Sequence, residues 1–355
     1  MDIRITKAAH PKAKTDEAQL GFGKVYTDHM FLLPYDAGRG WHDAEIRPYG
    51  PLALDPASMV FHYAQECFEG MKAYRTPTGA VQLFRPDRNA ARMNSTHRRL
   101  CIPELPQADF VQAVKALVAL ERDWVPASPN TSLYIRPCTI ATEPHIGVKP
   151  SSSYLFFIIC SPVGPYYAEG LNPVKIYVED ELTRAAPGGT GAIKCGGNYA
   201  ASLAGQVKAE QLGYTQVLWL DGAQRKYVEE VGSMNCFFKV DGEILTAPTA
   251  GGTVLPGITR MSCMELLQGW GYTVREEQIA IDELMDAARN GRLEEAFGTG
   301  TAAVISPVGE LRYKDETVCI HGGTTGTLTA RLYDTLTGIQ WGRLPDDHGW
   351  MVPVE

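Results

Sequence analysis

The sequence predicts a protein of mixed α+β and α/β class that folds as two domains joined by a short loop. Its 355 residues suit two domains of ordinary size, each able to bury its own core. In both halves, short β-branched or aromatic segments alternate with segments of helical period. A stretch rich in proline and glycine separates the halves. We therefore predict a smaller domain over 1–163, a linker over 164–173 and a larger domain over 174–355.

The first half alternates predicted strands and helices. Pro86 is expected to open a helix over 86–99, because proline is tolerated in the first helical turn. Apolar residues at 110, 114, 117 and 118 follow the helical period and predict a helix over 110–124. Strands are expected at three β-branched or aromatic segments, 80–84, 132–139 and 153–160.

The second half begins with a predicted strand and a glycine-rich loop. The segment 236–245 should form a hairpin that turns on Asp241-Gly242, a dipeptide typical of two-residue β-turns. The remaining predicted strands cover 174–179, 217–220 and 227–231. Helices are expected over 198–212, 258–269, 281–290 and 328–339.

Composition excludes several classes of protein. A formal net charge of −8 and the absence of a Lys/Arg run argue against a nucleic-acid binder. The longest apolar stretch, 154–160, is too short to span a bilayer, and the first residues lack the apolar core of a secretory signal, so we expect a cytoplasmic protein. The eight cysteines include no CxxC pair and the eight histidines are scattered, so neither a disulfide framework nor a metal site is expected.

One lysine lies in a glycine-rich run over 186–199, directly before a predicted helix. A lysine in such a setting can be desolvated, which favours the neutral amine that Schiff-base chemistry requires. The alternative is a glycine-rich loop with a solvated Lys194. A phosphate-binding P-loop is excluded, because Ile193 precedes this lysine and Cys195 follows it.

Two adjacent glutamates occupy the predicted strand over 227–231. Glu229 and Glu230 face opposite ways in a strand, so one of them can point into a site. A carboxylate among apolar residues needs a partner, and a pyridinium N–H would be one. The alternative places both carboxylates in solvent at a sheet edge.

Two further segments could bind anions through backbone N–H groups. Ile258 and Thr259 would open a helix, whose N-terminus attracts phosphate, although most such ends bind only water. The segment 297–303 spells GxGxxA, as in dinucleotide-binding proteins. The strand-like residues 304–307 that follow end at a proline instead of continuing as a helix. A tight turn, either anion-binding or ordinary, is therefore expected at 297–303.

Two arginines complete the candidate residues. Arg136 shares a strand face with Tyr134, two residues away, and Arg92 lies in the predicted helix over 86–99. The alternative for both is a solvated or ion-paired surface arginine.

Taken in order, these segments resemble the branched-chain amino acid aminotransferases, which are pyridoxal-phosphate enzymes of fold type IV. The resemblance implies a small N-terminal domain, a larger cofactor-binding C-terminal domain and a homodimer. It also implies transfer of the amino group of L-leucine, L-isoleucine or L-valine to 2-oxoglutarate in a ping-pong cycle. The matching segments are 21–30, 62–74, 83–86, 133–137, 191–199, 230–235, 255–260 and 300–303.

The resemblance also implies residue roles. Lys194 would carry pyridoxal 5′-phosphate and then move the proton of the substrate's Cα. Glu230 would pair with the pyridine nitrogen, and Tyr199 with the phenolate oxygen. The implied cofactor-binding residues are Arg92, Lys194, Tyr199, Glu230, Ser233, Ile258, Thr259 and Thr301. The implied substrate-binding residues are Phe22, Tyr63, Phe68, Tyr134, Tyr199, the amides of Thr301 and Ala302, and Arg136, which would receive the distal carboxylate of glutamate.

Rival functions remain. D-amino acid aminotransferases and aminodeoxychorismate lyase share the implied lysine and glutamate. A nicotinamide dehydrogenase would rest on the segment 298–303, and a binding protein could use the same glycine-rich loops without catalysis. Two departures from the family stand out. Ala303 and Ser306 replace a CxxC pair found in some relatives, and Ser233 replaces a common threonine.

Overall fold

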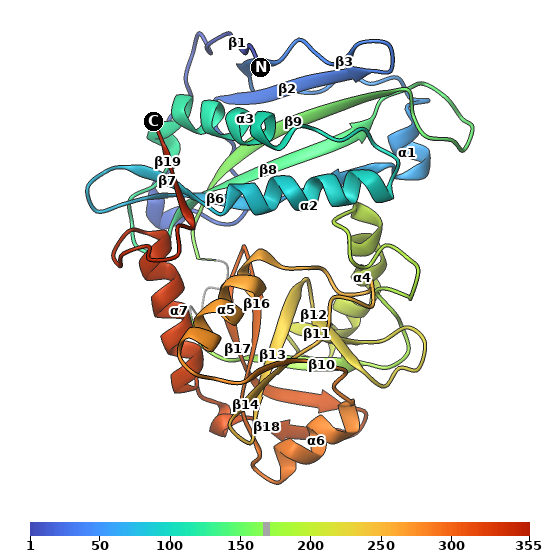
Figure 1. The fold of residues 1–355 in the computed structure, drawn as a ribbon, viewed down its shortest axis with the longest axis vertical. Helices are drawn as coiled ribbons and strands as arrows, with labels where there is room; N and C mark the ends of the chain where they lie inside the picture. The colour runs from blue at the N-terminus through green and yellow to red at the C-terminus, as the bar shows by residue number, and fades with distance from the viewer. Residues whose placement is uncertain (166–170) are drawn as a thin grey trace. The chain divides into compact units, whose positions relative to one another are not determined.

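The computed structural model describes residues 1–165 and 171–355, which form two compact units (Figure 1). The first contains the described residues up to Pro165 together with Lys194–Gly196 and Gly338–Glu355. The second contains the described residues to Ile193 and then Gly197–Thr337. Half of the predicted linker, residues 166–170, lies outside the described residues, so the division at 164–173 stays a prediction. In the part of the chain that is described, no helix combines the length and apolar character needed to cross a bilayer.

A ten-stranded sheet organises the first unit, in the order β1-β4-β2-β9-β8-β6-β7-β19, with β3 beside β2 and β5 beside β8. Its centre is the antiparallel pair of β8 and β9, which runs in register from Ser132 opposite Val163 to Ala141 opposite Tyr154. The strands are β1 (Arg4–Ile5), β2 (His29–Asp36), β3 (Gly40–Trp41), β4 (Glu45–Pro48), β5 (Glu66–Phe68), β6 (Met71–Arg75), β7 (Val81–Phe84), β8 (Ser132–Ala141), β9 (Ser153–Val163) and β19 (Met351–Val354).

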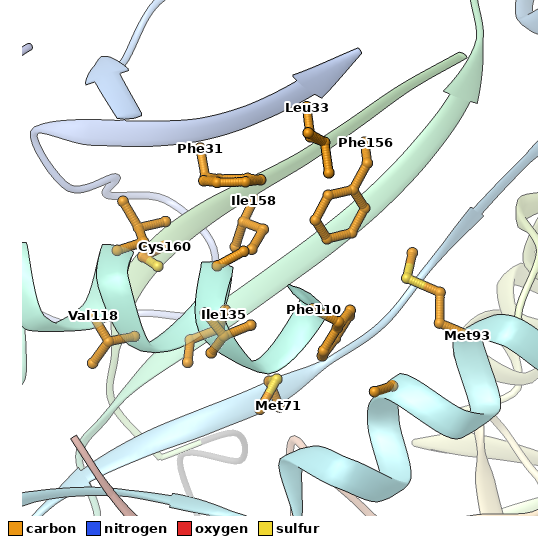
Figure 2. Packing of buried hydrophobic residues seen from close by; sticks show 14 of the residues in the cluster. Phe31, Leu33, Met71, Met93, Phe110, Val118, Ile135, Phe156, Ile158 and Cys160 are labelled. Atoms are coloured by element: carbon orange, nitrogen blue, oxygen red, sulfur yellow. The ribbon is translucent and has the colours of Figure 1, made fainter. Parts of the chain in front are cut away.

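Helices α2 (Pro86–Arg99) and α3 (Gln107–Leu120) cover one face of this sheet (Figure 1). Side chains alternate along a strand, so Leu133 and Ile135 of β8 point into the core under the helices. Figure 2 shows this packing, with residues from α2 and α3 against residues from β2, β6, β8 and β9. The other face of β8 carries Tyr134 and Arg136, which therefore lie outside this core. A short helix, α1 (Met59–Tyr63), precedes β5.

The second unit is built on a nine-stranded sheet, in the order β12-β11-β10-β17-β16-β13-β14-β15, with β18 beside β17. Because β12 also pairs with β13, the strands from β12 round to β13 close into a ring. The strands are β10 (Val174–Glu179), β11 (Gln216–Leu220), β12 (Val228–Val231), β13 (Met234–Val240), β14 (Glu243–Thr246), β15 (Val274–Glu276), β16 (Leu293–Gly300), β17 (Val304–Tyr313) and β18 (Glu316–Cys319). The helices are α4 (Gly196–Gln211), α5 (Ile258–Gly269), α6 (Ile281–Arg289) and α7 (Thr327–Gln340).

Most predicted elements are confirmed, and two need correction. The hairpin turns on Asp241 and Gly242, whose φ angles of 50° and 81° are those of a two-residue hairpin turn. The predicted helix over 110–124 begins earlier and ends at Leu120, and a short 3-10 turn, Arg122–Trp124, follows it. The strand expected to stop at Pro307 continues as β17. Pro307 is the last residue opposite β16, and the next residue, Val308, is opposite β10, so the missing N–H falls where the strand changes partner.

Candidate active site

Lys194 is fixed through its backbone in the first unit. The N–H of Phe68 in β5 donates to the Lys194 carbonyl at 3.1 Å. The Lys194 N–H donates to Oγ1 of Thr96 in α2, also at 3.1 Å. Two residues further on, the Gly196 N–H donates to Oε1 of Glu66. A strand and a helix therefore hold this lysine from both sides.

The Lys194 side chain joins an aromatic cluster. Its Nζ lies 4.9 Å from the centre of the Phe68 ring, and the Arg136 guanidinium lies 4.6 Å from the same centre. Arg136 Nη2 donates to the Tyr134 hydroxyl at 3.0 Å, and the Phe22 ring packs edge-on against Tyr134 at 4.9 Å. Five predicted site residues are thus brought together. The result is an apolar wall with cations at its edge, which suits both aliphatic and anionic side chains.

Gly70 makes room for this cluster. A Cβ at this position would collide with the Tyr134 hydroxyl, so only glycine lets the phenol lie across the backbone. Next along β6, Lys72 is directly opposite Tyr134 in the sheet. Burial lowers the pKa of Lys72 to about 7. The sequence gives no local sign that this lysine would be buried.

Arg92 forms a buried ion pair. Its Nε and Nη2 each donate to a carboxylate oxygen of Glu69, both at 2.8 Å, and Asn89 Nδ2 donates to Glu69 at 2.7 Å. Burial raises the pKa of Glu69, but the nearby charges of Arg92 and Lys194 and these hydrogen bonds lower it overall. Glu69 is fully buried, so the surface alternative for Arg92 is wrong. A guanidinium held in a bidentate fork has a fixed direction.

Glu229 and Glu230 are both buried in the second unit. Their strand, β12, has β11 on one side and β13 on the other, so the alternative of two solvated carboxylates at a sheet edge is wrong. Glu230 Oε1 accepts the Leu255 N–H at 2.7 Å. Burial raises the pKa of Glu229, which a hydrogen bond from Thr253 and the charge of Arg184 only partly offset.

Glu230 lines a recess together with two other predicted cofactor residues, Tyr199 and Ser233. The recess is partly open to solvent, and its cavity volume is about 10 Å³. The loop beside it is held by Asn198, which donates to the carbonyls of Thr190 and Ile193 at 2.7 and 2.8 Å. The other lining residues are Arg184, Gly191, Ile193, Asn198, Ser202, Gly232 and Leu255.

The first turn of α5 presents Ile258 and Thr259. Their N–H groups have no partner inside the helix, as at every helix start, and the capping residue Gly257 has no side chain to supply one. A Cβ at Gly257 would collide with Oδ1 of Asn235. This helix end therefore has the polarity that favours an anionic group.

Thr301 and Ala302 lie in the turn between β16 and β17, which closes with Gly300 opposite Val304. A strand follows this turn and no helix does. The dinucleotide motif needs a helix there, so the nicotinamide alternative loses its basis.

Comparisons with known proteins show the family of this chain. The family model for amino-transferase class IV matches residues 66–311. The chain is 54% identical over 352 residues to branched-chain-amino-acid aminotransferase 2 of Bacillus subtilis, covering 99% of this chain and 97% of that protein. The chain belongs to the branched-chain amino acid aminotransferase family. Another relative, from Mycolicibacterium smegmatis, is 47% identical over 359 residues, covering 98% of each protein.

Solved members of this aminotransferase family share the fold. The crystal structure of the Escherichia coli branched-chain amino acid aminotransferase has a TM-score of 0.78 and 27% identity, covering 92% of this chain and 99% of that one. The T.th. enzyme, solved with pyridoxamine 5′-phosphate, has a TM-score of 0.75 and 26% identity, covering 91% and 98%. The predicted fold-type-IV architecture is therefore confirmed.

Some residues of the candidate site were predicted from sequence and others were missed. Tyr63 lies in α1 and packs partly against the core of the first unit, so its role stays a prediction.

All eight cysteines are free thiols. No group of three potential metal ligands occurs within residues 1–165 and 171–355. Three missed residues contact predicted ones, namely Glu69, Thr96 and Arg184, and a fourth, Glu66, binds the backbone two residues after Lys194.

Proposed function

We propose that this protein is a transaminase that uses pyridoxal 5′-phosphate to pass the amino group of L-leucine, L-isoleucine or L-valine to 2-oxoglutarate. One observation carries the proposal. The Lys194 amine and the Arg136 guanidinium lie over the same Phe68 ring, at 4.9 and 4.6 Å from its centre. A nucleophilic amine is thereby placed beside an aromatic wall that ends in a cation, as a pocket for both leucine and glutamate requires.

The residues of the second unit fit the cofactor. A buried carboxylate, Glu230, matches a protonated ring nitrogen, and Tyr199 in the same recess matches the ring's phenolate oxygen. The uncapped first turn of α5 matches a phosphate. When bound, the cofactor stores the amino group between half-reactions and withdraws electrons from the substrate's Cα. The T.th. relative solved with pyridoxamine 5′-phosphate supports this choice.

Each proposed cofactor contact is assigned to a named residue. Lys194 attaches the cofactor and then moves the proton at the substrate's Cα. Glu230 accepts the ring N–H, Tyr199 donates to the phenolate oxygen, and Ser233 lines the same recess. We assign the phosphate to Arg92, to the amides of Ile258 and Thr259, and to the Thr301 hydroxyl. The fork from Glu69 supports Arg92 in this role by fixing its direction.

The proposed substrate contacts divide between side chain and carboxylate. Phe22, Phe68 and Tyr134, with Tyr199, wall the aliphatic side chain. Arg136 donates to the Tyr134 hydroxyl at 3.0 Å, which places its guanidinium at the edge of this wall, and we assign it to the distal carboxylate of glutamate. The substrate's own carboxylate is assigned to the amides of Thr301 and Ala302, with help from Tyr63. Leucine and 2-oxoglutarate then use one pocket in turn, in a ping-pong cycle.

We further propose a cytoplasmic homodimer. The eight free thiols suit a reducing compartment. Large apolar side chains stand exposed in each unit, including Val148 at 87% and Leu203 at 63%. A second copy of the chain would remove such surface from water. Light scattering during gel filtration tests the dimer.

The visible spectrum tests the proposed function. The purified protein, supplied with pyridoxal 5′-phosphate, should show the absorption band of a lysine-bound cofactor. L-leucine should bleach the band and 2-oxoglutarate should restore it. A band that ignores leucine but responds to D-alanine would move the protein to the D-amino acid branch. The absence of any band would refute cofactor binding and favour a binding protein.

A further inference from the structure

We propose that Arg184 is a positioning residue that keeps the Glu230 carboxylate ionised inside the second unit, so that this carboxylate can accept the ring N–H of the cofactor. The inference rests on the proposed function. It adds a residue that would act on the cofactor through Glu230.

Arg184 ties Glu230 to the loop that holds it. The guanidinium is buried, with 8% of the residue exposed. Its Nη2 donates to the Thr253 carbonyl and lies 3.5 Å from Glu230 Oε1. Two residues beyond Thr253, the Leu255 N–H donates to the same Oε1 at 2.7 Å. One guanidinium therefore fixes both the carboxylate and the backbone that donates to it.

The neighbouring Glu229 shows what burial does to a carboxylate in this strand. Burial raises its pKa, and its Oε2 has no hydrogen-bond partner. Glu230 is buried to a similar degree but has the ion pair with Arg184 and the Leu255 N–H. Both contacts favour the anion, because opposite charge and N–H donors stabilise it.

Three other ionisable groups near Glu230 carry no positive charge. They are the Glu229 carboxyl, the Cys236 thiol and the Tyr199 phenol. Arg260, whose charge acts on Cys236, is bonded to the Ala247 carbonyl and to Glu276. The Arg184 guanidinium, with Nη2 3.5 Å from Glu230 Oε1, brings a positive charge against this carboxylate.

The ionisation state of Glu230 decides what it can do. A carboxylate accepts a hydrogen bond from a protonated ring nitrogen. A neutral carboxylic acid already carries a proton and has no negative charge. It therefore no longer attracts the positively charged, protonated ring nitrogen. Removing the Arg184 charge should therefore weaken the contact between Glu230 and the ring nitrogen of the cofactor, and should leave the other cofactor contacts unchanged.

The test compares two ligands of the apoprotein, pyridoxal 5′-phosphate and its 1-deaza analogue, in which CH replaces the ring nitrogen. We expect R184Q to bind pyridoxal 5′-phosphate at least about tenfold more weakly than wild type does. This is the effect of a tenfold change in the acidity constant of the carboxyl group. Its affinity for the analogue should stay within about twofold of wild type, because the analogue has no ring proton to share. R184K keeps the charge and should restore most of the difference. In an E230Q background, R184Q should have no further effect.

Equal losses for both ligands would show that Arg184 only packs the loop, and unchanged affinity for both would show that Glu230 does not depend on it. Both results overturn the inference. A second measurement needs no Arg184 variant: the infrared difference between wild-type and E230Q apoprotein at neutral pH. It should contain a carboxylate band, and a carboxylic-acid band would overturn the inference even if R184Q fails to fold. Failure of wild type to bind pyridoxal 5′-phosphate would instead refute the proposed function.

Discussion

Phe68 holds Lys194 twice, through its backbone N–H, which donates to the Lys194 carbonyl at 3.1 Å, and through its ring, whose centre lies 4.9 Å from Lys194 Nζ. The backbone contact fixes the position of the Lys194 main chain, and the ring contact fixes the position of its amine. A long flexible side chain loses much rotamer freedom when it is held in this way, so less entropy remains to be lost when it reacts.

Replacement of this lysine should abolish the reaction. Lys194→Ala removes the amine that attaches the cofactor, so turnover of leucine with 2-oxoglutarate should fall to background. The control Lys175→Ala changes a mostly exposed lysine paired with Glu310 at 3.4 Å and should keep wild-type turnover. Steady-state rates measure the effect, and circular dichroism checks the fold. Wild-type turnover by the Lys194 variant would end the proposal.

Thr96→Val should lower activity through the lysine's backbone. The substitution removes the hydroxyl that accepts the Lys194 N–H, a partly buried hydrogen bond of 3.1 Å. Such a loss costs about 1–3 kcal/mol, and even a small shift of the amine should reduce kcat by about tenfold or more. Thr96→Ser retains the hydroxyl and should retain activity. If the two variants behave alike, this contact does not position the lysine.

Arg136→Ala should discriminate between the two substrates. Loss of a charged hydrogen bond to the distal carboxylate costs about 1.5–3 kcal/mol, or roughly tenfold to a hundredfold in kcat/KM for glutamate and 2-oxoglutarate. Leucine makes no such bond and should be affected much less. Tyr134→Phe, which removes the acceptor of the Arg136 bond at 3.0 Å, tests whether that contact restrains the guanidinium. Equal losses for all substrates would remove Arg136 from carboxylate recognition.

The two adjacent glutamates form a matched pair of variants. Glu230→Gln replaces the anionic partner of the ring nitrogen, and kcat should fall by about a hundredfold or more, as losses of electrostatic stabilisation commonly do. Glu229→Gln changes the neighbour on the opposite strand face and should leave kcat within about threefold. Rapid-quench measurement of the leucine half-reaction separates the two. The reverse order of effects would transfer the assignment to Glu229.

Glu229 should also give the unfolding free energy a measurable pH dependence. Its pKa in the folded protein is raised from the ordinary value of 4.5 by burial. The stabilisation from its protonated form is therefore complete below pH 4.5 and is lost as pH rises through the higher folded pKa. Glu229→Gln cannot ionise at this position, so its free energy of unfolding should decrease less than that of wild type as the pH rises through this range. Chemical denaturation at a series of pH values provides the test, and parallel curves would contradict it.

Local patterns in the sequence were enough to locate many elements and candidate residues. Pro86 begins α2 because its ring fixes its φ angle, and Asp241-Gly242 turns the hairpin because both residues tolerate positive φ angles. Residues such as Lys194 and Glu230 stood out because a charged group in a glycine-rich or apolar setting is unusual.

The supporting contacts could not be predicted, because each joins distant parts of the chain. Thr96 precedes Lys194 by 98 residues, and Glu69 precedes Arg92 by 23. No periodicity connects such pairs. The burial of Glu230 depends on the pairing of β12 with both β11 and β13, and a single strand pattern cannot show whether a strand is an edge.

The last strand of the first unit has a consequence for how the protein is made. β19, at Met351–Val354, pairs antiparallel with β7, at Val81–Phe84. During translation, β7 leaves the ribosome long before β19 exists, so one side of β7 waits without its partner while the second unit is synthesised. Domains usually fold in the order of their synthesis. Here the sheet begun first is completed last, and a ribosome that stalls before residue 351 releases a chain whose first sheet has an open edge.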